Sequence, residues 1–96
     1  MSKSIMQTEK ECYICRKLGF DTTRNLEEHH VLHGTANRKI AESDGLKVFL
    51  CHYHHRQLHD MGAWDRELQE EAQFKYMEYY GKSIAEFRSR YGKSYL

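Results

Sequence analysis

The chain has 96 residues, and its 15 basic and 14 acidic side chains leave a formal net charge of +1. This length predicts one domain, residues 1–96, whose apolar core alone would give marginal stability, and a structural metal is a common supplement at this size. The nearly balanced charge excludes a chain that binds nucleic acid through its overall charge, so any basic surface must be local. Residues 1–11 hold no apolar run typical of a signal peptide and no later segment could span a membrane, so we expect a cytoplasmic protein without a membrane partner.

The N-terminal half of the chain is predicted to contain short elements separated by turn signals. Residues 1–10 are polar, and we expect them to be loosely ordered. A tight cysteine-containing turn is expected at residues 12–19 and a short strand at residues 27–33. A helical turn at residues 38–43 and a second strand at residues 46–50 follow. The second strand has the strongest signal because it is rich in β-formers and directly follows the turn signal Asp44-Gly45.

Helical patterns dominate the remainder of the chain. Residues 52–60 are predicted to form a helix that Gly62 ends. Apolar residues then recur every four positions and predict an amphipathic helix with Gly81 as its C-terminal cap. These residues are Trp64, Leu68, Ala72 and Tyr76, with Tyr79 and Tyr80 close behind. Residues 83–86 match a capping box that opens a last helix ending near Tyr91. We interpret the aromatic residues as packing groups rather than as a platform for base stacking.

Two pairs of candidate metal ligands have the same spacing. A gap of two residues separates Cys12 from Cys15 and also Cys51 from His54. Three thiolates and one imidazole suit a tetrahedral zinc ion, and an odd number of cysteines in a cytosolic chain favours metal binding over disulfide bonds. Four protein ligands leave no open position, so we expect this zinc to be structural. Two such knuckles, the second at a strand-to-helix junction, predict a treble-clef arrangement. His52 is an alternative fourth ligand, although it directly follows Cys51 and this spacing would strain the chelate.

Four further histidines form a second candidate site. His55 and His59 are spaced i, i+4 and therefore share one face of the predicted helix. His29 and His30 are adjacent in a predicted strand, where successive side chains point to opposite faces. One of these two can bind a metal while the other faces a substrate as a base, since imidazole titrates near neutral pH, at about 6.5. The alternative is that these histidines add ligands to the structural zinc or cover a surface.

These motifs resemble those of the HNH endonucleases, which have the ββα-metal nuclease fold, and in particular the small HNH proteins of bacteriophages and prophages. The resemblance rests on Glu28-His29-His30-Val31, then Asn37, then Leu50-Cys51-x-x-His54-His55-x-x-x-His59. It covers residues 12–62 and implies a small α+β, zinc-bound ββα core there, followed by additional helices at 63–96. The cysteine pairs match the zinc-bound members of that family.

Position by position, the resemblance implies that His29, His55 and His59 bind a catalytic divalent cation and that His30 is the general base. Mg²⁺, Mn²⁺, Ni²⁺ and Zn²⁺ all remain open as the cation. The implied reaction is hydrolysis of a nucleic-acid phosphodiester, with DNA expected ahead of RNA, to give 5′-phosphate and 3′-hydroxyl ends. The implied compartment is the cytoplasm of a bacterial host. A zinc-dependent module of the same fold that binds nucleic acid or protein without cleavage stays open as the alternative.

The resemblance also implies a supporting residue for the base. Asn37 would hydrogen-bond the backbone near His30 and so fix that ring. The family's asparagine usually lies just before the second strand, where this chain has Asp44, so Asp44 is the substitute for this role. Three basic residues are candidates for phosphate contacts: Arg38, Lys39 and Arg56. The sequence does not set the oligomeric state.

Overall fold

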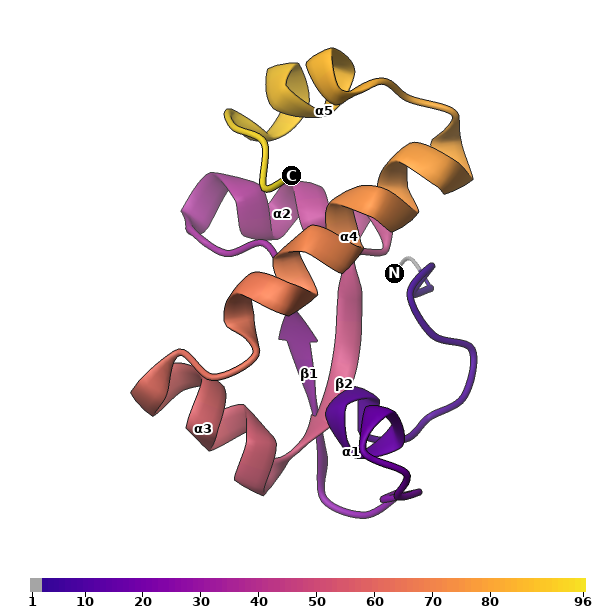
Figure 1. Ribbon diagram of the computed structural model, residues 1–96, viewed down its shortest axis with the longest axis vertical. Coiled ribbons are helices and arrows are strands. Elements are labelled where there is room, and N and C mark those ends of the chain that lie inside the picture. The colour runs from indigo at the N-terminus through magenta and orange to yellow at the C-terminus, as the bar shows by residue number, and fades with distance from the viewer. Residues whose placement is uncertain (1–2) are drawn as a thin grey trace.

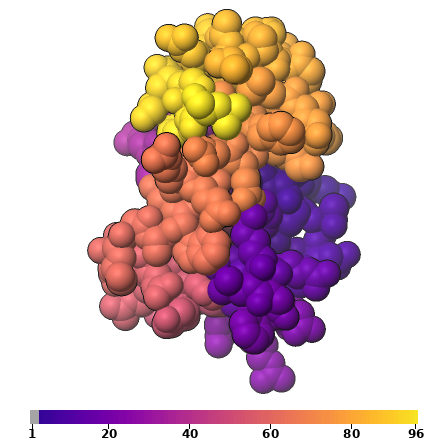
Figure 2. Space-filling view, viewed as in Figure 1, coloured from indigo at the N-terminus to yellow at the C-terminus, as the bar shows by residue number. Residues whose placement is uncertain are grey.

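The computed structural model describes residues 3–96 as a small α+β fold in which helices surround a two-stranded antiparallel sheet (Figure 1). The strands are β1 (Leu26–His30) and β2 (Lys47–Cys51). The helices are α1 (Tyr13–Lys17), α2 (Thr35–Asp44), α3 (His52–Met61), α4 (Asp65–Tyr80) and α5 (Ile84–Tyr91). Within residues 3–96 no helix combines the length and the apolar character that crossing a membrane requires. In the space-filling view the last helices cover the top of the molecule and the N-terminal segment lies along one side (Figure 2).

The sheet register decides which side chains meet across the strands. β1 pairs with β2 so that His30 lies opposite Lys47. β1 is shorter than the predicted strand at 27–33, because Val31 and Leu32 leave the sheet and are fully buried in the core. Adjacent residues within β1 keep the expected alternation, and this places the two histidines at its end on different faces.

The helix boundaries follow local capping signals. Gly62 and Gly81 adopt left-handed conformations, with φ of 70° and 65°, at the C-caps of α3 and α4. Ser83 and Glu86 form the predicted capping box at the start of α5, in which the Ser83 hydroxyl accepts from the Glu86 N–H at 3.1 Å. α2 is longer than the predicted helical turn at 38–43 and begins three residues before it. The structure therefore confirms the stop and start signals of the C-terminal helices.

The apolar core lies between the sheet and the C-terminal helices. Its fully buried side chains include Leu46 and Leu50 near β2 and Leu68 on α4. Each buried leucine stabilises the fold by about 1.5–3 kcal/mol relative to an exposed one. The ring of Tyr76 packs against Phe87 with centroids 5.6 Å apart, so the packing role expected for this aromatic position is confirmed.

One buried carboxylate joins α2 to α5. The Asp44 carboxylate accepts hydrogen bonds from Arg90 Nε at 2.6 Å, from Arg90 Nη2 at 2.8 Å and from the Tyr91 hydroxyl at 2.7 Å. The Asn37 amide donates to the main-chain oxygen of Tyr91 at 3.3 Å. Asn37 and Asp44 were the two residues expected to support the ring of His30. In the structure both side chains hold α5 in place instead.

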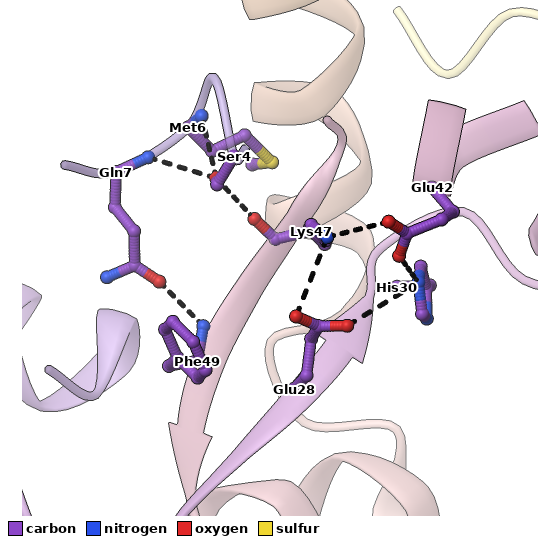
Figure 3. Close-up of polar contacts among 8 residues, drawn as sticks. All are labelled: Ser4, Met6, Gln7, Glu28, His30, Glu42, Lys47 and Phe49. Atoms are coloured by element: carbon purple, nitrogen blue, oxygen red, sulfur yellow. Dashed lines mark hydrogen bonds and ion pairs between the residues drawn. The ribbon is translucent and has the colours of Figure 1, made fainter. Parts of the chain in front are cut away.

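The N-terminal segment is anchored to the free edge of β2. Ser4 Oγ donates to the main-chain oxygen of Lys47 at 2.5 Å, and Gln7 Oε1 accepts from the Phe49 N–H at 2.6 Å (Figure 3). Side-chain hydrogen bonds of Ser4 and Gln7 thus hold residues 4–7 in place, and the expectation of loose order is wrong for these residues. The polar composition that suggested loose order supplies the groups that cover an otherwise unpaired strand edge.

Candidate metal centres

Four buried side chains from three elements converge in one cluster. Cys12 caps α1 and Cys15 lies within it, Cys51 ends β2, and His54 lies in the first turn of α3. The Cys12 sulfur accepts a hydrogen bond from the Cys15 N–H at 3.4 Å, which holds both thiols at the start of one short helix. All four residues are buried. Together they can hold one metal ion such as zinc.

The distances within this cluster match the edges of a zinc tetrahedron. Zn–S bonds of about 2.3 Å and Zn–N bonds of about 2.0–2.1 Å place two thiolates about 3.8 Å apart, and a thiolate and an imidazole nitrogen about 3.5 Å apart. The sulfurs of Cys15 and Cys51 are 3.8 Å apart. His54 Nδ1 lies 3.3, 3.4 and 3.7 Å from the three sulfurs. The four residues paired by their spacing in the sequence therefore fit a tetrahedral ion.

Burial and hydrogen bonds act together on the charge states in this cluster. Hydrogen bonds from Cys15 and Cys51 outweigh burial and lower the pKa of the Cys12 thiol. Burial raises the pKa of the Cys15 thiol to about 11 and lowers the pKa of the His54 imidazole. A neutral imidazole is the form that binds a metal, and a thiol that coordinates a cation is deprotonated. His52, the alternative fourth ligand, is exposed and has its Nδ1 3.3 Å from a carboxylate oxygen of Glu27. His54, rather than His52, is therefore the histidine of this cluster.

Three histidine rings from β1 and α3 form a second cluster. His29 is 4% exposed, and its Nε2 has no hydrogen-bond partner among residues 3–96. The His29 ring centroid is 5.3 Å from that of His55 and 5.7 Å from that of His59. A buried polar nitrogen without a partner is costly, so a group that binds it is expected. His29, His55 and His59 together can hold one metal ion.

Glu27 orients one ring of this second cluster. Its Oε1 is 2.6 Å from His55 Nδ1, and hydrogen bonds from His55 and then His52 lower the pKa of Glu27. An ionised carboxylate only accepts hydrogen bonds, so a neutral His55 donates from Nδ1 and keeps its Nε2 lone pair for a metal. The sequence analysis did not identify Glu27. Its position two residues before His29 places it on the same face of β1 and is the signal that could have identified it.

Two further side chains lie near His29: His33, shortly after β1, and Asp65, at the start of α4. The ring centroid of His33 is 6.0 Å from that of His29, and His33 Nε2 is 2.9 Å from Asp65 Oδ1. These three residues also could hold a metal ion. This set and the set of His29, His55 and His59 have His29 in common. The two possible metal positions therefore both lie beside the His29 ring. No spacing in the sequence links Asp65, in the first turn of α4, to the histidines of β1.

His30 has different neighbours from those of His29. His30 Nε2 is 2.8 Å from Glu42 Oε1, and Lys47 Nζ is 2.8 Å from Glu42 Oε2 (Figure 3). Glu28 is farther away, at 3.9 Å from His30 and 3.6 Å from Lys47. Glu28, His30 and Glu42 have the composition of a metal site. The Lys47 ammonium already pairs with both carboxylates, at 2.8 Å from Glu42 and 3.6 Å from Glu28, so we assign no metal to this group.

The two strand histidines reach one pocket of about 210 Å³. Its lining residues are Glu28, His29, His30, His33, Arg38, His55 and His59. A larger and more open groove of about 740 Å³ continues along α2 and shares His30, His33 and Arg38 with the pocket. The histidine cluster and His30 therefore both contact space that a ligand can enter, unlike the buried cysteine cluster.

Comparison with protein-family models, with curated proteins and with solved structures gives no match for this chain. Function is therefore inferred from the chemistry of the two clusters. The cysteine–histidine cluster has the composition and the burial of a site that stabilises a fold. The histidine cluster adjoins an open pocket, where a bound ion could contact a substrate.

Proposed function

We propose that the protein is a metal-dependent endonuclease of the HNH type that hydrolyses phosphodiester bonds of nucleic acid, with DNA ahead of RNA. The main support is that His29 Nε2, buried and without a hydrogen-bond partner among residues 3–96, belongs to a histidine cluster at a pocket which His30 also lines. A ligand set beside open space, with a separate histidine at the same pocket, suits metal-assisted hydrolysis.

In this proposal the cysteine cluster is a structural zinc site with a treble-clef arrangement. Four protein ligands saturate a tetrahedral ion, so this zinc takes no part in the chemistry. Its role is to fix α1 against the junction of β2 and α3. His54 is a ligand of this site and His55 is the next residue of α3. The structural zinc thereby positions the helix that presents His55 and His59 to the second site.

His29, His55 and His59 would hold the second ion. The residues present fit one because their nitrogens converge and His29 Nε2 has no hydrogen-bond partner in the described part of the chain. A bound divalent cation supplies polarisation of the scissile phosphate and stabilisation of charge on the leaving 3′ oxygen. An all-imidazole ligand set favours Zn²⁺ or Ni²⁺ over Mg²⁺, which prefers oxygen ligands.

The protein's own residues divide the remaining work. His30 accepts the proton of the attacking water, because neutral imidazole is an effective base near neutral pH. Strand alternation keeps His30 apart from the ligand His29 while both reach the same pocket. The products expected from this arrangement are 5′-phosphate and 3′-hydroxyl ends.

Basic residues of α2 provide a path for the nucleic-acid backbone. Arg38 lines both the pocket and the adjoining groove, and Lys39 lines the groove. Arg56 lines neither and pairs with Asp60 at 3.6 Å, so we assign no phosphate contact to it. Contacts of this kind position a strand without reading its bases.

Nicking of supercoiled plasmid tests the proposal. The protein should convert plasmid to the nicked form with Zn²⁺, Ni²⁺, Mn²⁺ or Mg²⁺ added singly, and a chelator should stop the reaction. Gel-shift binding to the same DNA distinguishes the nuclease from the alternative, a binding module. A binding module would bind the DNA but would cleave it with none of the four ions. Neither binding nor cleavage would contradict both functions.

A further inference from the structure

The ring of His30 is held by a carboxylate from a different element. His30 ends β1, and Glu42 lies in α2, with 2.8 Å between His30 Nε2 and Glu42 Oε1 (Figure 3). The His30 side chain is 15% exposed and the Glu42 side chain 33% exposed, so the contact is partly shielded from water. A contact between two elements fixes the ring relative to both of them.

Glu42 is itself held in place through its other oxygen. Lys47 Nζ lies 2.8 Å from Glu42 Oε2, and the Lys47 side chain is only 6% exposed. Lys47 faces His30 across the strand pair. The Glu42 carboxylate thus uses one oxygen for a buried ammonium and the other for the imidazole, and rotation of the carboxylate would break both contacts.

The charge of Glu42 determines which nitrogen of His30 is protonated. Hydrogen bonds from Lys47 and then from His30 lower the pKa of Glu42 to about 2. An ionised carboxylate can only accept, so Nε2 must be the donor in this 2.8 Å contact. In a neutral ring the proton on Nε2 leaves the lone pair on Nδ1.

We infer that Glu42 is a positioning residue, which fixes the Nε2–H tautomer of His30 and leaves Nδ1 as the proton acceptor; this inference rests on the proposed function of His30 as the base. A buried carboxylate likewise orients the catalytic histidine of serine hydrolases, although there it accepts from Nδ1 and leaves Nε2 as the base. Asn37, expected from the sequence to support this ring, donates to Tyr91 instead. Glu42 is instead hydrogen-bonded to the imidazole, at 2.8 Å.

Nitrogen-15 NMR of the histidine side chains tests the tautomer directly. His30 signals are assigned from their loss in a His30→Gln protein. We expect a neutral His30 in the full chain to be protonated at Nε2 alone, with an Nε2 proton protected from exchange with solvent. In Glu42→Ala the protection should be lost while the other histidine signals stay in place. Protonation at Nδ1 in the parent, or an unchanged Nε2 proton in Glu42→Ala, would overturn the inference.

Cleavage kinetics test the consequence of the tautomer. Glu42→Ala should lower kcat by roughly 10- to 100-fold, a part of the 10²–10⁴-fold typical of general-base catalysis, and leave KM nearly unchanged. Glu42→Gln should lose less, because its amide oxygen can still accept from Nε2. Glu78→Gln removes a surface carboxylate paired with Lys75 on α4 and should change neither constant. A raised KM at constant kcat would instead assign Glu42 to substrate binding and overturn the inference.

The NMR and kinetic experiments together distinguish a failure of this inference from a failure of the proposed function. If the parent protein cleaves no nucleic acid under any metal, the proposed function fails, and the NMR result still decides whether Glu42 fixes the ring. If the parent cleaves and Glu42→Ala retains full kcat with its zinc content and melting temperature unchanged, the inference fails and the proposed function stands.

Discussion

The Nε2 atoms of His55 and His59 lie 3.0 Å apart, one helical turn from each other on α3. Two imidazole nitrogens bound to one ion at Zn–N distances of about 2.0–2.1 Å are separated by about 2.8–3.4 Å for angles between about 90° and 110°. The pair therefore already has the separation that a shared metal requires. Glu27 holds the far nitrogen of His55 and leaves its Nε2 directed at His59.

The first prediction concerns the structural zinc. His54→Ala should remove about one equivalent of tightly bound zinc and destabilise the fold strongly, since zinc binding in small domains contributes on the order of 10 kcal/mol to folding. Metal analysis and thermal unfolding measure the two effects. His52→Ala is the matched control, because His52 is exposed and lies outside the cluster. Folded parent protein without zinc, or equal zinc content in the two variants, would contradict the prediction.

The second prediction concerns the histidine cluster. His55→Ala should abolish divalent-dependent cleavage while the zinc held by the cysteines remains bound. His59→Ala should have a milder effect, because His59 is exposed and water can replace it as a ligand. Plasmid nicking and zinc analysis on the same samples give both values. Loss of the structural zinc in His55→Ala would show that His54 and His55 have exchanged roles.

Local spacing in the sequence predicted much of both metal clusters. A two-residue gap places both ligands of a pair in one turn. The site is then complete once the pair of Cys12 and Cys15 meets the pair of Cys51 and His54. The i, i+4 gap predicted the neighbouring rings of His55 and His59 in the same way. The C-terminal helices were also predictable, because glycine caps and a capping box are local signals.

The residues that the sequence did not reveal act through tertiary contacts. Glu42 meets His30 only because α2 packs beside β1, and Asp65 meets His33 only because α4 returns to the sheet. The expected support for His30 from Asn37 failed for the same reason. Nothing local showed that α5 would dock on α2 and use the Asn37 amide. Polar residues that pair across elements have no spacing signature.

The third prediction concerns pH and His29. Burial, and then the neighbouring His55, lower the pKa of His29 to about 3, below the value near 6.5 of an exposed histidine. Below about pH 6.5 the unfolded chain therefore binds a proton that the native protein does not bind. The contribution of neutral His29 to the free energy of unfolding is therefore complete above that pH. It decreases toward pH 3, by up to about 1.4 kcal/mol per pH unit.

Urea unfolding between pH 7 and pH 5 measures this effect in protein treated with a mild chelator that leaves the cysteine-bound zinc in place. The free energy of unfolding of the parent should fall faster with decreasing pH than that of His29→Gln. His33→Gln removes a half-exposed histidine and should follow the slope of the parent. Parallel slopes for the parent and His29→Gln would contradict the burial argument.

The fourth prediction concerns the link between α2 and α5. Asp44→Asn should destabilise the protein by about 1–3 kcal/mol, because it removes charge-assisted hydrogen bonds from Arg90 and Tyr91 at a buried position. Asp60→Asn removes a carboxylate that is 62% exposed and 3.6 Å from Arg56, so its effect should stay within about 0.5 kcal/mol. Urea unfolding compares the two, and equal losses would show that the Asp44 contacts add no stability.

The last prediction distinguishes a nuclease from a binding module and depends on His30. If His30 is the general base, His30→Ala should leave zinc content and DNA affinity nearly unchanged while cleavage falls about 10²–10⁴-fold. Only cleavage should be affected, because His30 lines the pocket but belongs to neither of the two metal clusters that we assign. Loss of its contact with the partly exposed Glu42 should cost little stability.

Nicking rate, gel-shift affinity and zinc content should be measured together for His30→Ala and for His52→Ala, which removes an exposed histidine outside the pocket. A nuclease predicts that only His30→Ala loses cleavage and that both variants bind DNA equally. A fold that merely needs the His30 ring predicts lower stability and lower zinc content in His30→Ala. Full cleavage by a well-folded His30→Ala protein would remove His30 from the mechanism.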